Sequence, residues 1–284
     1  MAQAYDHLGN EATPHNSDGV AVIGRGIGET PHASPLTDPF TRYGVQPVGQ
    51  SGYGDPVFSD EFKMGFNASK WEPYYPDTAF WNTTVPGGHL TNSNEPQGYD
   101  LSAISFDADG MVLTMRHEET VEGLAYTSGM ITSYPSFNPI YGYFEARMKL
   151  SNTNGAWPAF WMFPTNQVWP PEIDIMENWG KASYNLQTEH TFHYPRPTPG
   201  SYSGSTYGYP QDIGNDFHVW GCRWEPGRIR WYVDGQLAKD LTIVETYANR
   251  QMFLILNFAG AHGSSPQVPA SVKIDYVRAW ALPG

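Results

Sequence analysis

Three carboxylates lie close together in the segment 172–177, which reads Glu-Ile-Asp-Ile-Met-Glu. The residues between the acids are all apolar, which predicts a strand with one face in the core and an acidic face in a pocket or groove. Glu172 and Asp174 share a face because side chains alternate along a strand. Glu177 is five residues from Glu172 and would point to the other face, unless an extra residue at 175–176 forms a β-bulge. The segment therefore predicts a row of three carboxylates.

Such a row could cleave a glycosidic bond. Retaining hydrolysis uses two carboxyl groups about 5–5.5 Å apart, one as the nucleophile and one as the acid/base. The long side chains of Glu172 and Glu177 could lean together across the roughly 13 Å that separates their Cα atoms along a bulged strand. Asp174 lies between them and could share a proton with a neighbour, which would hold the two glutamate pKa values apart.

Tryptophans flank the acidic segment on both sides. They are Trp157, Trp161, Trp169 and Trp179. Indole rings bind the flat C–H faces of sugars. The alternative for each of these tryptophans is that it packs in the core. Their clustering around the acids favours a sugar-binding groove.

The elements that must position these residues are predicted to be β-strands. Alternating or β-rich runs occur at 57–62, 111–116, 141–150, 159–163, 184–194, 217–224, 229–233, 252–258 and 272–280. Asp234-Gly235, directly after one run, predicts a hairpin turn. Aromatic residues make up 15% of the chain, which also has 29 Gly and 24 Pro, and no segment has a long helical period. We expect two antiparallel sheets packed face to face, with a groove across one of them.

The chain is predicted to consist of an arm and one large domain. Residues 1–52 are rich in Gly, Pro, Ser, Thr and His and form the predicted arm or linker, which could attach the protein to a larger assembly such as a phage tail. Residues 53–284 form the predicted catalytic domain. The glycine-containing run 20–28 is a poor dinucleotide-binding loop because Pro31 and Pro35 block the helix that should follow.

Charge and cysteine content exclude several classes of function. The net charge of −13 argues against a nucleic-acid partner, and no apolar run is long enough to span a membrane. The N-terminus lacks the basic start and apolar core of a secretory signal, so the chain either begins after a removed signal or is not exported by that route. Cys222 is the only cysteine, which excludes an intramolecular disulfide, and we expect a buried structural thiol.

The segment 172–177 resembles the bulged E-x-D-x-x-E signature of glycoside hydrolase family 16, as found in its laminarinase-like members. Further segments that resemble the family follow in its order along residues 55–281. They are 155–162, 217–221, 224–226, 229–235 and 275–278. The resemblance implies an all-β fold, a two-sheet antiparallel β-jelly-roll sandwich with a concave substrate groove, and retaining endo-hydrolysis of β-linked glucans or galactans.

The same resemblance implies functions for individual residues. Glu172 would be the nucleophile, Glu177 the acid/base and Asp174 the auxiliary acid that orients Glu172. Trp161 would stack on the sugar at the cleavage point, and His193 would lie near the acid/base. The other expected substrate-binding residues are Trp157, Trp179, Glu95, Gln97 and Arg147. A simple turn is the alternative for the loop of Glu95 and Gln97, and a buried ion pair is the alternative for Arg147.

The resemblance implies no cofactor for catalysis and a structural calcium ion far from the reaction site. The matching ligands would be Glu61, a backbone carbonyl near Gly88, and Asp275. Ligands that supply only oxygen atoms suit calcium.

The sequence therefore predicts an enzyme that hydrolyses internal β-glycosidic bonds in a polysaccharide, most simply a β-1,3-glucan or a related β-glucan. An endo-β-galactanase or another cell-wall polysaccharide depolymerase is one alternative, and a non-catalytic carbohydrate-binding protein is another. The expected partner is the polysaccharide, without nucleic acid or membrane insertion. An extracellular or virion-associated location is expected.

Overall fold

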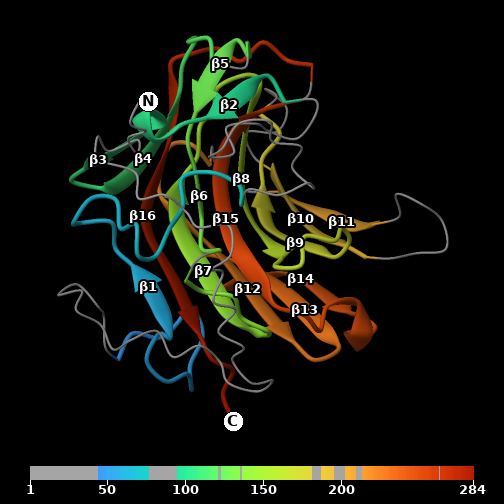
Figure 1. Cartoon of the computed structure of the whole chain (residues 1–284). Helices are drawn as coiled ribbons and strands as arrows, with labels where there is room; N and C mark the ends of the chain where they lie inside the picture. The colour runs from blue at the N-terminus through green and yellow to red at the C-terminus, as the bar shows by residue number, and fades with distance from the viewer. Residues whose placement is uncertain are drawn as a thin grey trace, which may run out of the picture. The chain divides into compact units, whose positions relative to one another are not determined.

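The computed structural model describes residues 44–76, 95–120, 123–134, 136–180, 187–194, 213–261 and 263–284, and the backbone of residues 202–208. Almost all of its regular structure is β-strand, as the sequence predicts (Figure 1). The predicted arm up to residue 43, Gly88 and the start of the expected strand 184–194 lie outside the described residues.

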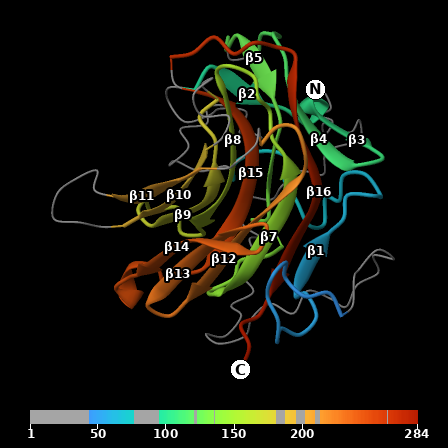
Figure 2. The ribbon, with the colours of Figure 1, turned by 180° about the vertical axis from the view of Figure 1, so that it is seen from behind.

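The larger sheet is antiparallel and has eight strands (Figure 2). In spatial order they are β14 (Gln236–Thr242), β13 (Arg228–Val233), β12 (His218–Glu225), β7 (Gly142–Lys149), β16 (Ala270–Trp280), β4 (Gly110–Met115) and β3 (Ile104–Asp107), with β1 (Phe58–Asp60) paired to β16. The predicted hairpin turn connects β13 and β14, and both Asp234 and Gly235 have positive φ angles, of 48° and 78°. This conformation is the one that an Asp-Gly turn allows at low cost.

The smaller antiparallel sheet has six strands. In order they are β11 (Tyr202–Gly208), β10 (Gln187–His193), β9 (Glu172–Glu177), β8 (Ala156–Pro164), β15 (Met252–Gly260) and β6 (Met130–Thr132). Two short strands, β2 (Gln97–Tyr99) and β5 (Tyr126–Ser128), pair in parallel, and two short 3-10 helices, η1 (Leu101–Ala103) and η3 (Glu245–Tyr247), complete the described elements.

The main core lies between the two large sheets. On β9, Ile173, Ile175 and Met176 belong to it, together with large aromatic residues of the eight-stranded sheet such as Trp224 and Trp231. Complete burial of a large apolar side chain contributes about 1.5–3 kcal/mol to the free energy of unfolding. Cys222 is fully buried in this core, which confirms the prediction of a buried thiol.

The other face of the six-stranded sheet, here called its outer face, carries a second apolar cluster. It includes Trp161 and Phe163 of β8 and Phe253 and Ile255 of β15, which alternate with core residues along each strand. Tyr75 and Tyr99 of the preceding segments pack on the same cluster. An aromatic surface is therefore present beside β9, on the side where the acids are expected.

Residues 44–53 pack against the eight-stranded sheet, on the face opposite the core. The backbone N–H of Val48 donates to Glu145 at 3.0 Å, and Trp280 Nε1 donates to the carbonyl of Val45 at 2.9 Å. Tyr53 joins a separate aromatic cluster there. Residues 44–52 of the predicted arm therefore pack along the domain.

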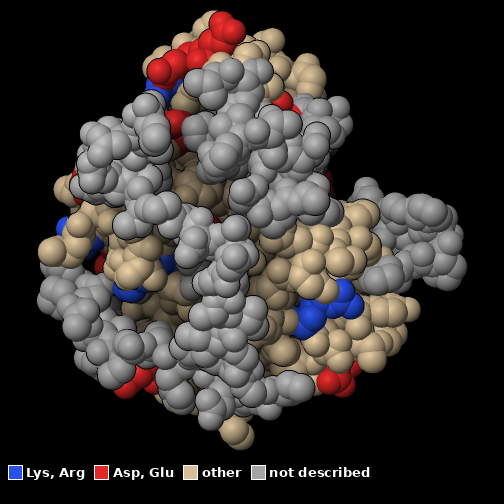
Figure 3. All heavy atoms as spheres, in the orientation of Figure 1, with Lys and Arg blue, Asp and Glu red and all other residues tan. Residues whose placement is uncertain are grey.

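The described residues contain no helix long and apolar enough to cross a membrane. On the face in Figure 3, the described Lys and Arg side chains form small groups that other residues separate.

Candidate active site

The acidic segment is a strand with a bulge, as its sequence predicts. Between β9 and β8, Met176 pairs with Phe160 and Asp174 pairs with Trp161, so Ile175 is the additional residue. The pairing of β9 with β10 is interrupted at the same place. Because Ile175 and Met176 both enter the core, Glu177 returns to the outer face that Glu172 and Asp174 share.

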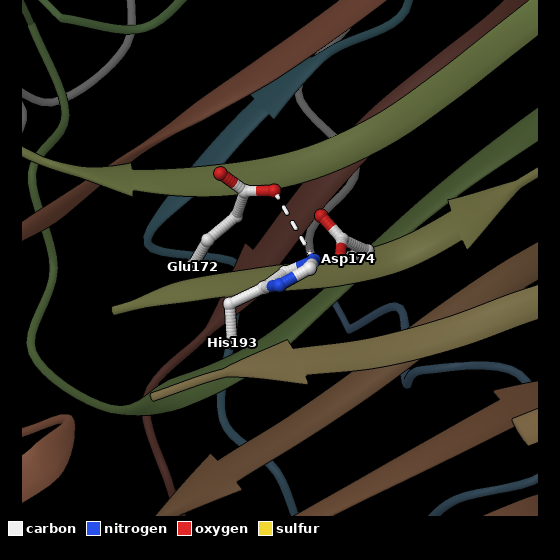
Figure 4. A group of neighbouring side chains, drawn as sticks. All are labelled: Glu172, Asp174 and His193. Carbon is white, nitrogen blue, oxygen red and sulfur yellow. Dashed lines mark ion pairs between the residues drawn. The ribbon is translucent and has the colours of Figure 1, made fainter. Parts of the chain in front are cut away.

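Glu172, Asp174 and His193 form a compact group on this face (Figure 4). His193 Nε2 lies 3.1 Å from Asp174 Oδ2 and 3.6 Å from Glu172 Oε1. The Glu172 side chain keeps 19% of its surface exposed, whereas that of Asp174 keeps only 3%. Glu172 can therefore contact a bound molecule, and Asp174 can act only through its neighbours. One histidine and two carboxylates could also hold a metal ion by their spacing, but the direct contact of His193 with Asp174 brings the group together without one.

Burial and mutual repulsion raise the pKa values of this carboxyl pair. For Glu172, burial is the largest cause and the neighbouring Asp174 charge is the second. For Asp174, burial is again first, followed by the charge of Glu177. The two carboxyl groups are hydrogen-bonded, so a single shared proton removes their repulsion and leaves one negative charge. Burial also lowers the pKa of His193, which favours its neutral form beside them.

Glu177 lies beside a stacked pair of tryptophans. Trp157 Nε1 donates to Glu177 Oε1 at 3.0 Å, and the Trp157 and Trp179 rings stack with centroids 4.2 Å apart. Burial, followed by the Glu172 charge, raises the pKa of Glu177 to about 8, although the Trp157 hydrogen bond lowers it. Glu177 is therefore protonated at neutral pH, the state that a general acid requires.

A fourth acid faces Glu177 across the strands. Glu189 of β10 is the cross-strand partner of Glu177, and its negative charge raises the pKa values of both Glu177 and Asp174. Glu189 was not predicted from the sequence because its position opposite Glu177 depends on the register between β9 and β10. An alternating polar residue in the run 184–194 was the only available signal.

Replacing Glu189 by glutamine is expected to move the basic limb of the kcat/KM pH profile to lower pH. Burial and the Glu172 charge still raise the pKa of Glu177, but the smaller contribution of the Glu189 charge is then absent, so Glu177 loses its proton at lower pH. The pH profile on the true substrate measures the change. Glu118→Gln is the control, because Glu118 is an exposed acid paired with Arg116. A basic limb that stays in place would contradict the assignment.

Replacing Trp157 by phenylalanine should have the opposite effect on the same limb. The variant keeps a ring against Trp179 but loses the N–H that donates to Glu177, so the pKa of Glu177 rises. We expect the basic limb of kcat/KM at higher pH than in the wild type. A basic limb that stays in place or moves to lower pH would contradict an effect of the indole N–H on Glu177.

Glu95 and Gln97 belong to a buried hydrogen-bond network next to the acids. Gln97 Nε2 and the Tyr99 hydroxyl both donate to Glu95 Oε2, at 2.7 and 3.2 Å. Asn257 Nδ2 donates to the Tyr99 hydroxyl, and Trp161 Nε1 donates to Asn257 Oδ1, each at 2.8 Å. Burial raises the pKa of Glu95 to about 7.

This network reaches the outer face through Tyr75, whose pKa is raised by burial and then by the charges of Glu95 and Glu172. Trp161 is only 9% exposed and lies edge-on to Tyr75, with ring centroids 6.3 Å apart. Its position next to Asp174 in the ladder agrees with a place at the cleavage point. Stacking of Trp161 on a sugar stays a prediction.

Trp169 is a further aromatic residue at the site and was expected only as a flanking tryptophan. Its ring centroid lies 5.8 Å from that of His193, and 42% of the residue is exposed. A hydrogen bond from the Trp169 side chain lowers the pKa of Glu172, against the effects of burial and of Asp174. Trp169 therefore borders the Glu172 end of the acidic row.

Two sequence-based placements are wrong. His193 lies against Glu172 and Asp174 rather than near Glu177, because β9 and β10 are antiparallel and the later residues of β10 pair with the earlier residues of β9. Arg147 is on β7 of the other sheet, where its side chain pairs with Asp275 at 2.8 Å and lies over the Phe217 ring. The structure does not bring Arg147 to the acids.

The carboxylates expected to bind calcium already have cationic partners. Both oxygens of Glu61 accept from Arg278, at 2.7 and 2.8 Å. Asp275 pairs with Lys63 through one oxygen and with Arg147 through the other. As arranged, Glu61 and Asp275 do not fit a calcium ion, since each of their oxygens faces a positive charge. The expected carbonyl near Gly88 lies outside the described residues.

Comparison with known proteins gives one family. The profile of the family described as Glycosyl hydrolases family 16 matches residues 91–278. The chain is 30% identical to the endo-1,3-1,4-beta-glycanase ExsH of Rhizobium meliloti over 249 residues, which cover 80% of this chain and 51% of that protein. It is 33% identical to a beta-glucanase of Rhodothermus marinus over 252 residues, which cover 79% of this chain and 84% of that protein.

A solved structure has the same fold. The laminarinase catalytic domain of Thermotoga maritima aligns with a TM-score of 0.69 at 30% identity, covering 80% of this chain and 98% of that domain. The chain spans about half the length of the first curated relatives that it matches, at 51% of each.

Proposed function

This chain belongs to glycosyl hydrolase family 16, and on that premise we propose that it is a retaining endo-β-glucanase. The proposed reaction is the hydrolysis of internal β-glycosidic bonds in a β-1,3-glucan or a related β-glucan. One observation carries the proposal. The bulge at Ile175 brings Glu177 to the face of Glu172, so that two glutamates of one strand can act on the same bound sugar chain.

In the proposed mechanism, Glu172 attacks the anomeric carbon while the bond to the leaving sugar oxygen breaks. Glu177 gives its proton to that oxygen, for which its pKa of about 8 is suited at neutral pH. The product of this step is a glycosyl ester on Glu172. Glu177, now ionised, removes a proton from water, and the water oxygen displaces Glu172 with overall retention of configuration.

Asp174 and His193 keep Glu172 ready for attack. Asp174 is nearly buried and hydrogen-bonded to Glu172, and because that bond raises the pKa of Glu172, the proton that the pair shares must pass to Asp174 before Glu172 attacks. Burial lowers the pKa of His193 and favours its neutral form, so its ring lies against Asp174 without adding a positive charge. The pair can thus present an ionised Glu172 although burial disfavours its charge.

Two observations support a β-glucan as the substrate. The relatives named above are a beta-glucanase and an endo-1,3-1,4-beta-glycanase, and the solved structure is a laminarinase catalytic domain. Aromatic rings also border the row of acids at both ends, with Trp169 beside His193 and the Trp157–Trp179 pair beside Glu177. Rings in these positions suit successive sugar faces of a chain that crosses the sheet.

Incubation with laminarin, lichenan, agarose and β-galactans, followed by mass spectrometry of the products, tests the substrate. We expect oligosaccharides of several lengths from a β-glucan, and ¹H NMR should show the β-anomer as the first product. Release of oligosaccharides from a galactan alone would show that the substrate is a galactan and not a β-glucan. Binding of a polysaccharide without any product would overturn the assignment as an enzyme and favour a carbohydrate-binding protein.

We further propose that the enzyme acts outside the cytoplasm or on a virion, where such polysaccharides occur. The composition of residues 1–52 suits an attachment segment. Removal of residues 1–43, which precede the packed segment, should then leave β-glucan hydrolysis unchanged and abolish attachment to the larger assembly. Loss of hydrolysis on that truncation would contradict an attachment function.

A further inference from the structure

The bulge of β9 is held from its core side by two side chains. Trp231 Nε1 of β13 donates to the carbonyl of Asp174 at 2.8 Å. His190 Nδ1 of β10 lies 2.8 Å from the carbonyl of Ile175, the additional residue of the bulge. Burial lowers the pKa of His190 to about 4, so its ring is neutral and must carry its proton on Nδ1 to donate to a carbonyl. Buried carbonyls at an interrupted ladder need such donors.

Lys239 connects these two donors. It lies directly opposite Trp231 in the β13–β14 ladder, and its Nζ is 4.6 Å from the centroid of the Trp231 ring. The same Nζ donates to the carbonyl of His190 at 2.6 Å. Trp231, His190 and Lys239, here called the bulge clamp, therefore join both sheets beneath the acidic row.

A lysine in this position has an energetic cost. Burial lowers the pKa of Lys239 to about 8, while the charges of Asp174 and Glu189 oppose that change. The lysine thus stays protonated at neutral pH, and its charge lowers the pKa of Asp174. It also lowers the pKa values of His190 and His193. An apolar residue such as methionine would fill the space without this cost.

We propose that Lys239, His190 and Trp231 are positioning residues that fix the bulge which aligns Glu177 with Glu172, and that the Lys239 ammonium, held between the Trp231 ring and the His190 carbonyl, places a positive charge beneath the strand that carries Asp174. The proposal rests on the proposed function, because alignment of the two glutamates matters only if they cleave a bond. None of the three residues needs to touch the substrate.

The charge of Lys239 is tested by Lys239→Met and Lys239→Arg. Lys239→Met keeps the length of the side chain and removes its charge, and Lys239→Arg keeps the charge. In ¹³C NMR titrations of the carboxyl groups, we expect a higher pKa for Asp174 in Lys239→Met and a value near that of the wild type in Lys239→Arg. An Asp174 titration that is the same in all three proteins would overturn this part. This readout needs no substrate, so it stands even if the proposed function fails.

Kinetics on β-glucan then test the consequence for catalysis. For Lys239→Met we expect kcat to fall about tenfold or more with KM nearly unchanged, and the acidic limb of kcat/KM to move to higher pH. In Lys239→Arg, the acidic limb of kcat/KM should lie at the same pH as in the wild type. A fall in melting temperature without movement of the limb would mean that Lys239 only stabilises the fold.

The geometric part is tested by Trp231→Phe against Trp224→Phe. Both tryptophans are fully buried in the same core, and Trp224 Nε1 has no hydrogen-bond partner among the described residues. The two variants lose the same volume, but only Trp231→Phe loses a donor to β9. We expect kcat to fall about tenfold further in Trp231→Phe, with the acidic limb in place because Lys239 remains. Equal activity of the two variants would overturn the proposal that the bulge clamp positions Glu177.

Discussion

Glu172→Ala is expected to lower kcat for β-glucan hydrolysis by about four orders of magnitude or more, because no covalent intermediate can form without the nucleophile. The Glu172 side chain is the accessible member of the Glu172–Asp174 pair, and its removal leaves the core residues of β9 in place. Release of reducing ends from the true substrate measures the loss, and circular dichroism checks the fold. Activity within about tenfold of the wild type would contradict the assignment.

Azide distinguishes loss of the nucleophile from general damage to the site. With an activated aryl β-glycoside, azide can enter the space left by Glu172 and form a C–N bond at the anomeric carbon while the aryl oxygen leaves. The expected product is the α-glycosyl azide, since attack comes from the face that Glu172 occupied. Glu177 variants provide the control, because Glu172 still forms the intermediate there and azide should give the β-glycosyl azide instead.

Glu177→Gln is expected to lower kcat/KM on the polysaccharide by about 10²–10⁴-fold, because the leaving sugar oxygen no longer receives a proton. An aryl β-glycoside with a good leaving group needs no such proton. We therefore expect it to react quickly and give a burst, after which the glycosyl-enzyme is hydrolysed slowly. If both substrates lost the same factor at the first step, Glu177 would not be the general acid.

Glu177→Gln should also change the pH dependence of activity and stability. The wild-type kcat/KM should fall above about pH 8, where Glu177 loses its proton, and this limb should be absent in the variant. Because burial raises the pKa of Glu177 in the folded state, the folded protein binds more protons than the unfolded chain between the two pKa values, and stability falls as pH rises through that interval. The variant should thus have the higher melting temperature, most clearly near pH 8. A lower melting temperature at pH 8 would contradict this sign.

Local pattern was sufficient for the acidic strand. Alternation along a strand is a property of neighbouring residues, so the apolar spacers at 173, 175 and 176 and the odd offset of Glu177 required a bulge, which the register confirms. The Asp-Gly turn at 234–235 was predictable for the same reason, since its conformation depends on its own two residues. The all-β class followed from many such local signals together.

The partners across the strands were not predictable in this way. His193 and Glu189 lie on one strand with the same alternation, and only the antiparallel register decides that His193 lies beside Glu172 and Glu189 beside Glu177. Arg147 has a pattern on β7 that suits either face of a sheet, and the packing of two sheets places it away from the acids.

The sequence by itself determined the acidic row, its bulge and the sandwich. Each depends on patterns among residues that are close together in the chain, within one or two turns or strands of one another. The tertiary structure alone decided which groups set the charges of that row. Glu189 lies 12 residues along the chain from Glu177 and Lys239 lies 65 residues from Asp174, yet their charges change the pKa values of those acids. Electrostatic coupling depends on distance in space and on burial, and both exist only after the two sheets have packed.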